Sequence, residues 1–395
     1  MKVLQVADFY PPAPGGLEAH VRRLAHALAD RGHDVEVVAG APAARHDDDG
    51  GIPVHRVPVT VSKLLYRQAG RAFHPPWPDG AVRHAIRRVL ARFGADVVHA
   101  HGWSAFSAAS VAAAAGRPVV VTLHDYGLRC PKKTLLRGDG ECHTGRGPQC
   151  LSCPGDEQGT LKRAALAAAL APAVPWLRER VARVIAVSRH VAERHRADWP
   201  DIEVIPNFLE PLPPPFRSFA PPAGRGILFV GPADRHKGLP VLLRALGHRP
   251  AGTAHVTVVG APGAGDGPVA FTGRLTGDAL WRRYREAAVV AAPATWPDPC
   301  PTVVLEALAM GRPVVGSRTG GLPDLVDHGT TGLLVRPGDE RALAAALGAL
   351  LDDDRRRLAM ARAAHVSAEQ FSTASVVPRI EAVYAGVASR PGIRL

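Results

Sequence analysis

The chain alternates short apolar runs with segments of helical periodicity, and this alternation constrains its fold most. Leu17–Arg31 is an example of the helical segments. The runs of strand length in the first half are Val3–Val6, Val35–Val38, Val97–His99, Val119–Leu123, Val184–Val187 and Glu203–Ile205. A strand–helix–strand rhythm of this kind produces a parallel sheet covered by helices. The sequence therefore predicts an α/β protein with doubly wound, Rossmann-like sheets.

The rhythm breaks once, in a proline-rich stretch without periodicity over Asn207–Gly226. It restarts with apolar runs at Ile227–Val230, Val256–Val259, Val289–Ala291, Val314–Val315 and Leu333–Val335. A chain of 395 residues also exceeds the length at which one core usually stops growing. We predict a first domain over 1–207, a linker over 208–225, a second domain over 226–372 and a final helical segment over 373–395. Ligands of open α/β sheets bind beyond the carboxyl ends of the strands, so we expect a site in the cleft between the domains.

Composition narrows the class of function. A hydrophobic content of 46% fills two cores, and no apolar run approaches the roughly 20 residues of a membrane span. The first residues lead directly into a strand and not a signal peptide, so we expect a cytoplasmic protein. The net charge of +12 is evenly spread, with 27 basic and 21 acidic residues in 1–210 and 21 and 15 in 211–395. This spread excludes a dedicated nucleic-acid arm and suits phosphorylated ligands or contact with an anionic membrane face.

The segment Trp296–Val315 carries the most specific signal for chemistry. Pro299 and Pro301 stop any helix before Thr302, a residue type favoured at N-caps, and the following residues from Val303 have a helical pattern. The free N–H groups and the positive end of that helix would attract an anion such as a diphosphate. From the first turn Glu306 can accept bonds from a ribose diol, while Asp298 on the loop can meet other hydroxyls. A surface turn capped by an acid is the structural alternative.

This segment resembles the acidic pair, usually Glu-x7-Glu, of the family-4 glycosyltransferases, although the first acid here is Asp298. The resemblance extends over nearly the whole chain, from the strand and Gly-Gly loop of Met1–Glu18 to the Gly-Gly segment within Gly311–Val326. It implies the GT-B fold, a final helix that crosses back to the first domain, and retention of anomeric configuration. It also implies a nucleoside diphosphate sugar as donor and no metal in catalysis.

The loop after the first strand contains Gly15 and Gly16, which let the backbone approach a ligand, while the next helix offers its N–H groups. We expect Gly16 to contact a donor phosphate and Glu18 to lie at the acceptor. A Gly-Gly pair alone is equally typical of an ordinary turn.

Two strands of the first domain end in polar side chains. Val119–Leu123 is followed by His124, Asp125 and Tyr126. The resemblance places His124 close to the transferred sugar; Asp125 would orient that sugar or bond the acceptor, and Tyr126 would contact the acceptor. His101 ends the neighbouring strand and either lines the acceptor pocket or satisfies local backbone groups.

The second domain contributes basic and backbone groups for the donor. Lys237 follows a strand and precedes a helix, where its ammonium can meet a diphosphate. The family pattern has an arginine where this chain has Pro232, so Arg235 is the candidate for the second cation. The resemblance also assigns Gly273, Arg274 and Leu275 to the nucleobase, through their backbone groups.

Four of the five cysteines lie in one irregular insert over 130–153, namely Cys130, Cys142, Cys150 and Cys153. A Cys-x2-Cys pair with two further thiols in a cytosolic chain favours a closed tetrahedral zinc site that would order this loop. Two disulfides or an iron–sulfur cluster are the alternatives. The insert follows His124 and Asp125, so it would form a lid or an acceptor wall.

The stretch Glu157–Val184 combines an apolar stripe with three arginines near its end. Packing against the protein is the more common use of such a helix, and peripheral contact with a membrane surface is the alternative.

Together these features predict a retaining glycosyltransferase that moves a sugar from a nucleoside diphosphate sugar to a hydroxyl of a glycan, a lipid-linked acceptor or a natural product. Lys237, the backbone at Gly16 and the helix after Thr302 would stabilise the diphosphate charge, with Asp298 beside them. A sugar-nucleotide-binding partner protein without transfer activity and a GT-B epimerase are the alternatives. A glycosidase with two flanking carboxylates is disfavoured, because Asp298 and Glu306 share one loop–helix unit beside the phosphate site.

Overall fold

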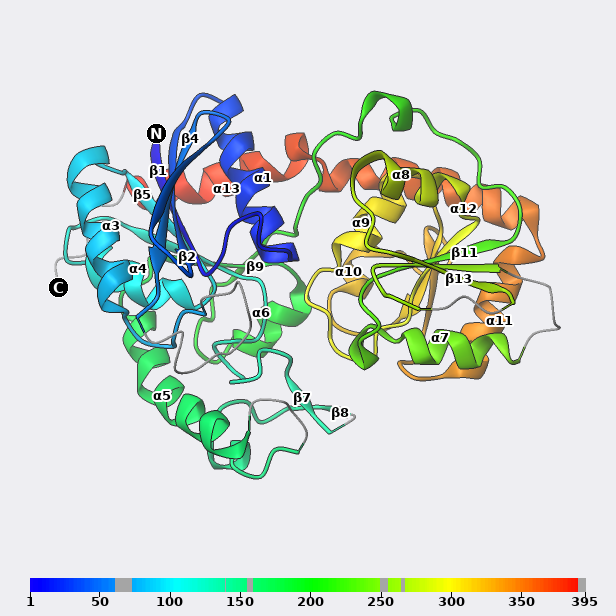
Figure 1. Cartoon of the computed structure of the whole chain (residues 1–395), viewed down its shortest axis with the longest axis horizontal. Helices are drawn as coiled ribbons and strands as arrows, with labels where there is room; N and C mark the ends of the chain where they lie inside the picture. The colour runs from blue at the N-terminus through cyan, green and yellow to red at the C-terminus, as the bar shows by residue number, and fades with distance from the viewer. Residues whose placement is uncertain (61–72, 139, 155–158, 249–254, 264–266, 390–395) are drawn as a thin grey trace. The chain divides into compact units, whose positions relative to one another are not determined.

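The computed structural model describes residues 1–60, 73–138, 140–154, 159–248, 255–263 and 267–389 (Figure 1). The chain forms two compact units: Met1–Pro206 together with the segment from Val376 onward, and Asn207–Ser375. The predicted linker over 208–225 thus belongs to the second unit, where it contains a single turn of 3₁₀ helix, Pro214–Phe216, before the first strand of that unit.

The first unit contains an eight-stranded sheet in the order β10-β9-β6-β5-β1-β2-β4-β3. Its strands are β1 (Lys2–Ala7), β2 (Asp34–Ala41), β3 (Arg45–Asp49), β4 (Ile52–Pro58), β5 (Val97–His101), β6 (Val119–Leu123), β9 (Arg183–Ala186) and β10 (Glu203–Val204). All pairings are parallel except that of β3 with β4. The apolar runs identified in the sequence are the central strands, since their residues are buried on both faces.

Helices connect the strands of this unit. They are α1 (Gly16–Asp30), α3 (Gly80–Phe93), α4 (Ala105–Ala112), α5 (Thr160–Arg178), α6 (Arg189–His195) and α13 (Thr373–Ala388). Helix α3 begins at Asp79, whose carboxylate accepts bonds from the N–H groups of Ala81 and Val82, and ends at Gly94 in the left-handed conformation. These are the signals that start and stop helices in general.

Helix α13 packs on the first unit, although 169 residues of the other unit precede Val376 in the chain. Glu381 on α13 accepts two bonds from Arg31, at 2.7 and 2.8 Å, and one contact of 2.9 Å from His33. The buried hydroxyl of Tyr384 lies 2.7 Å from Nδ1 of His99 on β5. Polar contacts therefore join α13 to the residues that follow α1 and to β5 in the middle of the sheet.

The second unit contains a six-stranded sheet, entirely parallel, in the order β13-β12-β11-β14-β15-β16. Its strands are β11 (Gly226–Val230), β12 (His255–Val259), β13 (Val269–Gly273), β14 (Val289–Ala292), β15 (Val314–Ser317) and β16 (Gly332–Val335). Its helices are α7 (Leu239–Leu246), α8 (Gly277–Glu286), α9 (Thr302–Ala309), α10 (Leu322–Leu325), α11 (Glu340–Leu351) and α12 (Asp354–Ser367). The prediction of α/β units with doubly wound parallel sheets is confirmed in both units.

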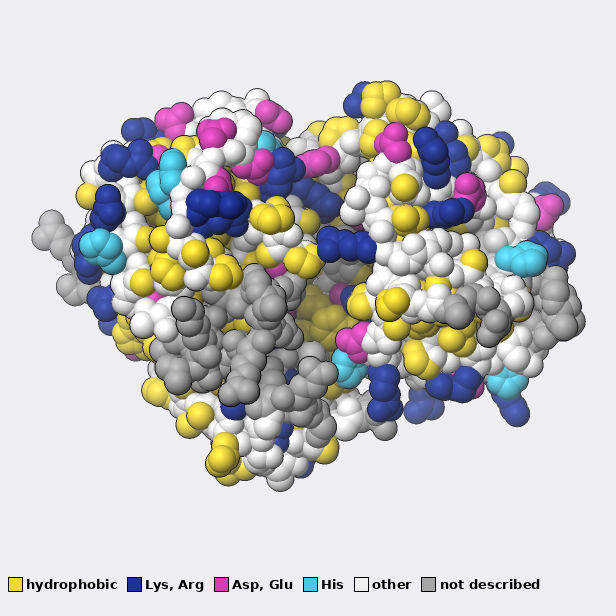
Figure 2. Space-filling model, in the orientation of Figure 1, with side chains coloured by type: hydrophobic (Ala, Val, Ile, Leu, Met, Phe, Trp, Pro, Cys, Tyr) yellow, Lys and Arg dark blue, Asp and Glu magenta, His cyan; other side chains and the backbone are white. Residues whose placement is uncertain are grey.

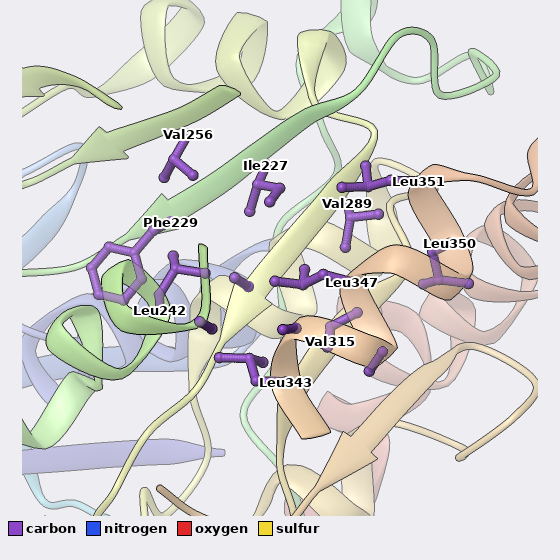
Figure 3. Close-up of a cluster of buried hydrophobic side chains, with 14 of the residues drawn as sticks. Ile227, Phe229, Leu242, Val256, Val289, Val315, Leu343, Leu347, Leu350 and Leu351 are labelled. Atoms are coloured by element: carbon purple, nitrogen blue, oxygen red, sulfur yellow. The ribbon is translucent and has the colours of Figure 1, made fainter. Parts of the chain in front are cut away.

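A contiguous apolar core holds the second unit together (Figure 3). Ile227 and Phe229 of β11 and Val289 of β14 meet Leu242 of α7 and Leu347 of α11, and all five are nearly or fully buried. Burial of side chains of this size stabilises the fold by about 1.5–3 kcal/mol each. The core fixes the strand ends, and these carry the candidate site.

The cysteine-rich insert has little regular structure of its own. It contains a short antiparallel pair, β7 (Leu136–Arg137) and β8 (Gly140–Glu141), and one turn of 3₁₀ helix, Pro148–Cys150. Helix α5 follows it and includes the apolar stripe noted in the sequence.

No helix in the described part of the chain is both long and apolar enough to cross a membrane. On the face seen in Figure 2, Lys and Arg side chains are scattered among other types and do not gather into one patch. This pattern agrees with the even charge distribution along the sequence.

Candidate functional site

In each unit some of the candidate site residues follow the strands at which the strand order reverses. The reversal lies between β1 and β5 in the first unit and between β11 and β14 in the second. Loops at such a point diverge to opposite faces of the sheet and leave a crevice beyond the carboxyl ends of the strands. Asp8 and His101 lie at this edge in the first unit, and Lys237 and Asp298 in the second.

Lys237 and Asp298 form an ion pair within the second unit. Nζ of Lys237 donates to Oδ2 of Asp298 over 2.6 Å, and the same nitrogen lies 5.4 Å from the centroid of the Trp296 ring. The carboxylate is buried, whereas 34% of the lysine side chain is exposed. An ammonium has three N–H groups. Asp298 therefore fixes the position of Lys237 while the lysine can still donate to a ligand.

Helix α9 begins directly after the loop that carries Asp298. Thr302 is its first residue and Pro301 occupies the N-cap position, so the expectation of Thr302 at the N-cap is corrected by one residue. Proline fixes a backbone angle suited to this position. No side chain of the described residues caps the helix. Its first N–H groups, those of Thr302 and Val303, are therefore placed to bind an anion.

Glu306 lies one turn into α9 and is almost completely buried. Its Oε2 accepts a 2.6 Å hydrogen bond from the hydroxyl of Tyr284 on α8. Burial, together with the negative charge of Glu306, raises the pKa of Tyr284 well above its usual value, so the phenol stays protonated and donates. The tyrosine orients the carboxylate, whose oxygens can each accept more than one hydrogen bond.

Two glycines allow the loops of this site to approach each other. Gly238 precedes α7 with φ of 79°, and a Cβ there would come within 1.8 Å of the carbonyl oxygen of Pro293. Gly320 has φ of 56°, and its Cβ would meet the backbone of Pro297 and Asp298. Side chains at these positions would displace the loops that carry Lys237 and Asp298.

The other residues predicted to bind the donor lie at the same edge of the sheet. Arg235 is exposed in the loop after β11, and its carbonyl oxygen accepts from the hydroxyl of Thr295. Gly273 is the last residue of β13, with its carbonyl bonded to the N–H of Gly260, and Arg274 and Leu275 follow it. The parallel topology gathers these loops although 63 positions separate Arg235 from Asp298 in the sequence.

The first unit has a buried carboxylate that was missed in the sequence. Asp8, directly after β1, accepts from the N–H groups of Trp103 at 3.2 Å and Ser104 at 2.7 Å, and from Nζ of Lys133 at 3.1 Å. Its position at the end of a strand is the signal that could have identified it. Lys133 comes from the cysteine-rich insert, where no periodic pattern marks it.

Asp125 lies close to this group. Its Oδ1 accepts from the N–H of Gly127 at 2.7 Å, and its carboxylate is 3.8 Å from Nζ of Lys133. Burial raises the pKa of Asp125, and Lys133 opposes that shift. One lysine of the insert thus faces two carboxylates, and the role of the insert as a lid or acceptor wall stays a prediction.

His101 and His124 are adjacent, with 3.0 Å between Nδ1 of His101 and Nε2 of His124. His20 on α1 packs its ring 4.7 Å from that of His124, measured between centroids. The low-polarity surroundings lower the pKa of His124 to about 3. His101 and His20 are buried and their pKa values are also lowered, so all three imidazoles are neutral near pH 7. His20 was missed in the sequence because it resembles any other residue on a helix face.

The other residues of the first unit that were predicted to bind substrate differ in how exposed they are. Gly16 is exposed and is the first residue of α1. Glu18 is buried and its carboxylate folds back over Gly15, where it faces the positive end of the helix. Tyr126 is fully buried, with its ring 6.4 Å from that of His195, so it has no exposed surface in this unit with which to meet an acceptor.

The four cysteines of the insert are free thiols. Within the described residues their sulfurs do not converge as a group of three or more metal ligands. Sγ of Cys150 donates to the carbonyl of Gly145, and Sγ of Cys153 to that of Leu136. These two thiols face separate carbonyl groups, and the predicted zinc site is not assembled in the described residues.

Two family models match the chain. Residues 14–211 match the model described as Glycosyltransferase Family 4, and residues 224–353 match the model described as Glycosyl transferases group 1. The two matches fall on the two units, and together they include every predicted site residue.

Curated relatives cover most of the chain. A D-inositol 3-phosphate glycosyltransferase of an Arthrobacter species is 30% identical over 389 residues, 90% of this chain and 86% of the relative. A glycogen synthase of Mycobacterium tuberculosis is 28% identical over 399 residues, 92% of this chain and 89% of the relative.

Solved structures show the same fold at lower identity. Sucrose-phosphate synthase from Thermosynechococcus elongatus has a TM-score of 0.74 and 19% identity, with 98% of this chain and 99% of that chain covered. The Anabaena protein HepE in complex with UDP has a TM-score of 0.68 and 20% identity, with coverage of 98% and 100%.

Proposed function

The chain belongs to family 4 of the glycosyltransferases and is a GT-B enzyme that uses a nucleotide sugar, and we propose that it transfers the sugar with retention of configuration and without a catalytic metal. The observation that carries this proposal is the arrangement at one edge of the second sheet. There the partly exposed Lys237 pairs with Asp298, and the loop that carries Asp298 leads into the uncapped start of α9, the helix of the buried Glu306. These groups offer positive charge for a diphosphate and a carboxylate for a ribose.

The chemical problem that the site must solve is the charge of the leaving group. As the bond between the anomeric carbon and the phosphate oxygen breaks, negative charge grows on the diphosphate. Lys237 and the N–H groups of Thr302 and Val303 stabilise this charge without a divalent cation, and Arg235 is the candidate for the second cation. The acceptor oxygen attacks from the face that the leaving group departs, and its proton passes to the leaving phosphate oxygen.

Groups of the first unit complete the proposal. His124 would contact the sugar ring, and Asp125 would orient it or accept a bond from the acceptor. The Gly16 backbone would meet the donor phosphate, while Glu18 and His101 would help to form the acceptor site. The acceptor is a hydroxyl of a glycan, a lipid-linked glycan or a small molecule, and inositol phosphate and glucan acceptors are the first to assay because of the names of the relatives.

The nucleotide can be identified by thermal shift. We expect one of UDP, GDP, ADP, CDP and dTDP to raise the melting temperature selectively, and UDP and ADP lead the panel because solved neighbours contain them. A ligand at 100 times its Kd stabilises the native state by about 2.7 kcal/mol, a shift of roughly 5–10 °C for a unit of this size. If none of the five shifts the melting temperature at millimolar concentration, the proposed donor site is wrong.

Glu306 should determine whether the site distinguishes ribose from deoxyribose. We expect Glu306→Ala to weaken binding of the selected nucleotide by about 10–100-fold, since a hydrogen bond to a charged group contributes about 1.5–3 kcal/mol. Binding of the 2′-deoxy nucleotide should change much less. Isothermal titration of both nucleotides measures this.

Tyr284→Phe is the matched control, because it removes the hydroxyl on Glu306 but leaves the carboxylate. It should retain most of the preference for ribose. Equal losses for both nucleotides in Glu306→Ala would contradict a contact between Glu306 and the ribose.

A further inference from the structure

Three histidines of the first unit come together from separate elements. His20 lies on α1, His101 is the last residue of β5, and His124 follows β6. Each ring contributes one nitrogen, and these nitrogens lie within 4.8 Å of one another. In the described part of the chain this is the one group of three or more His, Cys, Asp and Glu side chains that converges in this way.

The distances approach those around a single metal ion. Zinc binds imidazole nitrogen at about 2.0–2.1 Å, so two such nitrogens at a tetrahedral angle lie roughly 3.3 Å apart. Nδ1 of His101 and Nε2 of His124 are already 3.0 Å apart. A nitrogen at the upper limit of 4.8 Å would have to approach the others by roughly 1.5 Å to share the ion.

A metal ion binds an imidazole through a ring nitrogen that carries no hydrogen. One of the two nitrogens in the contact between His101 and His124 carries a hydrogen, which must leave it before both can bind the ion. When His101 is the donor, its hydrogen moves to its own Nε2, a buried atom without a hydrogen-bond partner among the described residues. When His124 is the donor, its hydrogen moves to its own Nδ1.

A fourth histidine, His99, packs against this group of three rings. His99 packs its ring 4.2 Å from that of His101, measured between centroids. His99 is itself fixed by the hydroxyl of Tyr384 on one side and that of Thr122 on the other, each at 2.7 Å. Packing of this kind holds a ligand ring in place. His124 is partly exposed, so an ion can reach the rings from solvent.

We propose that His20, His101 and His124 bind one divalent transition-metal ion, of which zinc is the representative. Three imidazoles without a carboxylate suit zinc, cobalt, nickel or copper, and do not suit magnesium or calcium, which prefer oxygen ligands. Three protein nitrogens and one open position are also the arrangement of many zinc sites that exchange a ligand.

The ion would have a regulatory effect on the reaction proposed above. His124 is the residue expected to contact the transferred sugar, so an ion on its ring occupies that position. Zinc therefore inhibits transfer, and a chelator restores it. This consequence rests on the proposed function, whereas binding of the ion does not, and the two are tested separately.

Binding is measured on the full chain without an affinity tag, after removal of metal by a chelator and in the absence of nucleotide. Co²⁺ is the probe, because its visible absorption reports coordination number and its near-ultraviolet charge-transfer bands report thiolate ligands. We expect one Co²⁺ per chain with visible bands and no thiolate bands, displaced by Zn²⁺ and not by Mg²⁺. The double variant Cys142→Ser/Cys153→Ser should leave this spectrum unchanged.

Variants assign the ligands. His20→Gln and His101→Gln should each weaken binding by at least about 100-fold, since even the loss of a residue that only supports a ligand costs 10–100-fold. His46→Gln is the matched control, because His46 also packs against a second histidine, His55, with centroids 4.7 Å apart, but lies on strand β3. Circular dichroism and melting temperature verify that each variant is folded.

Thiolate bands that disappear in the cysteine variant would place the metal in the insert and overturn the proposal. Unchanged affinity in a folded His20→Gln variant, or no Co²⁺ binding at submillimolar concentration, would also overturn it. The inhibition is then tested with Zn²⁺ in the transfer assay. If the ion binds through the histidines and transfer is unaffected, the proposed position of the sugar at His124 fails while the metal site stands.

Discussion

Replacement of Lys237 by alanine is expected to lower kcat of sugar transfer by about 10²–10³-fold. The loss of one preorganised donor to a developing negative charge typically has this effect. In this structure Asp298, in the loop before α9, holds the ammonium of Lys237 at 2.6 Å, so the donor is in place before charge develops on the leaving group. The removal also leaves the buried Asp298 carboxylate without its cation. Single-turnover rates with the nucleotide sugar identified by the panel measure the effect.

Arg244→Ala is the matched control for this variant. Arg244 is an exposed cation of α7 that pairs with Glu340, so its removal changes the charge of the second unit equally without changing the site. Asp298→Asn removes the charge of the lysine's partner. Lys237 keeps its charge but is no longer held by an ion pair, so the loss of kcat should be smaller than in Lys237→Ala. Unchanged kcat in a folded Lys237→Ala variant would remove Lys237 from the stabilisation of the leaving group.

Acid is expected to destabilise the metal-free protein steeply below about pH 6.5. Burial lowers the pKa of His99 to about 3 and that of His195 to about 4. In the unfolded chain both groups titrate near 6.5. Between these values the unfolded chain binds protons that the folded chain does not, so folding stability is complete above pH 6.5 and decreases as the pH falls.

The size of this effect follows from the proton balance. At pH 5 each such histidine removes about 2 kcal/mol, so His99 and His195 together remove about 4 kcal/mol of a typical total of 5–15 kcal/mol. His20, His101 and His124 act in the same direction. Denaturant unfolding at pH 7.5, 6 and 5 measures the free energy of unfolding at each pH.

The surroundings of the two histidines provide a control. His99 faces Tyr384, Thr122 and His101, and none of these carries a negative charge near neutral pH. His195 lies near Asp198, but Arg129 and Arg146 balance that carboxylate. His195→Gln should reduce the slope of stability against pH by about one proton between pH 6 and 5. A slope that is the same in the variant and the parent would show that His195 is already protonated in the folded state.

The central sheet could be predicted from the sequence because buried parallel strands form continuous apolar runs. The edge hairpin of β3 and β4 could not. Strand β3 has the sequence Arg-His-Asp-Asp-Asp, which carries no apolar alternation, and it forms because the turn at Gly50 and Gly51 places it against β4. Its carboxylates are then held by arginines, as in the pairs of Asp49 with Arg22 and Asp47 with Arg56.

In the candidate site, too, some residues could be predicted from the sequence and others could not. Lys237, Asp298 and Glu306 could be selected because they follow strands or begin a helix in one local segment. Their partners could not, since Tyr284 lies on another helix and meets Glu306 only through the packing of α8 against the sheet. His20 and Lys133 likewise acquire neighbours from elements distant in sequence, and local periodicity carries no information about such contacts.

From Val376 onward, helix α13 belongs to the first unit but follows the whole second unit in the sequence. Its position determines when the first unit can be completed during synthesis. A ribosome releases residues 1–206 long before it makes Tyr384, so Nδ1 of His99 lacks its phenol partner while the whole of Asn207–Ser375 emerges. The second unit, by contrast, is one continuous stretch and can fold as soon as it leaves the exit tunnel. A nascent chain can therefore complete the second unit before the first unit gains its contacts with α13.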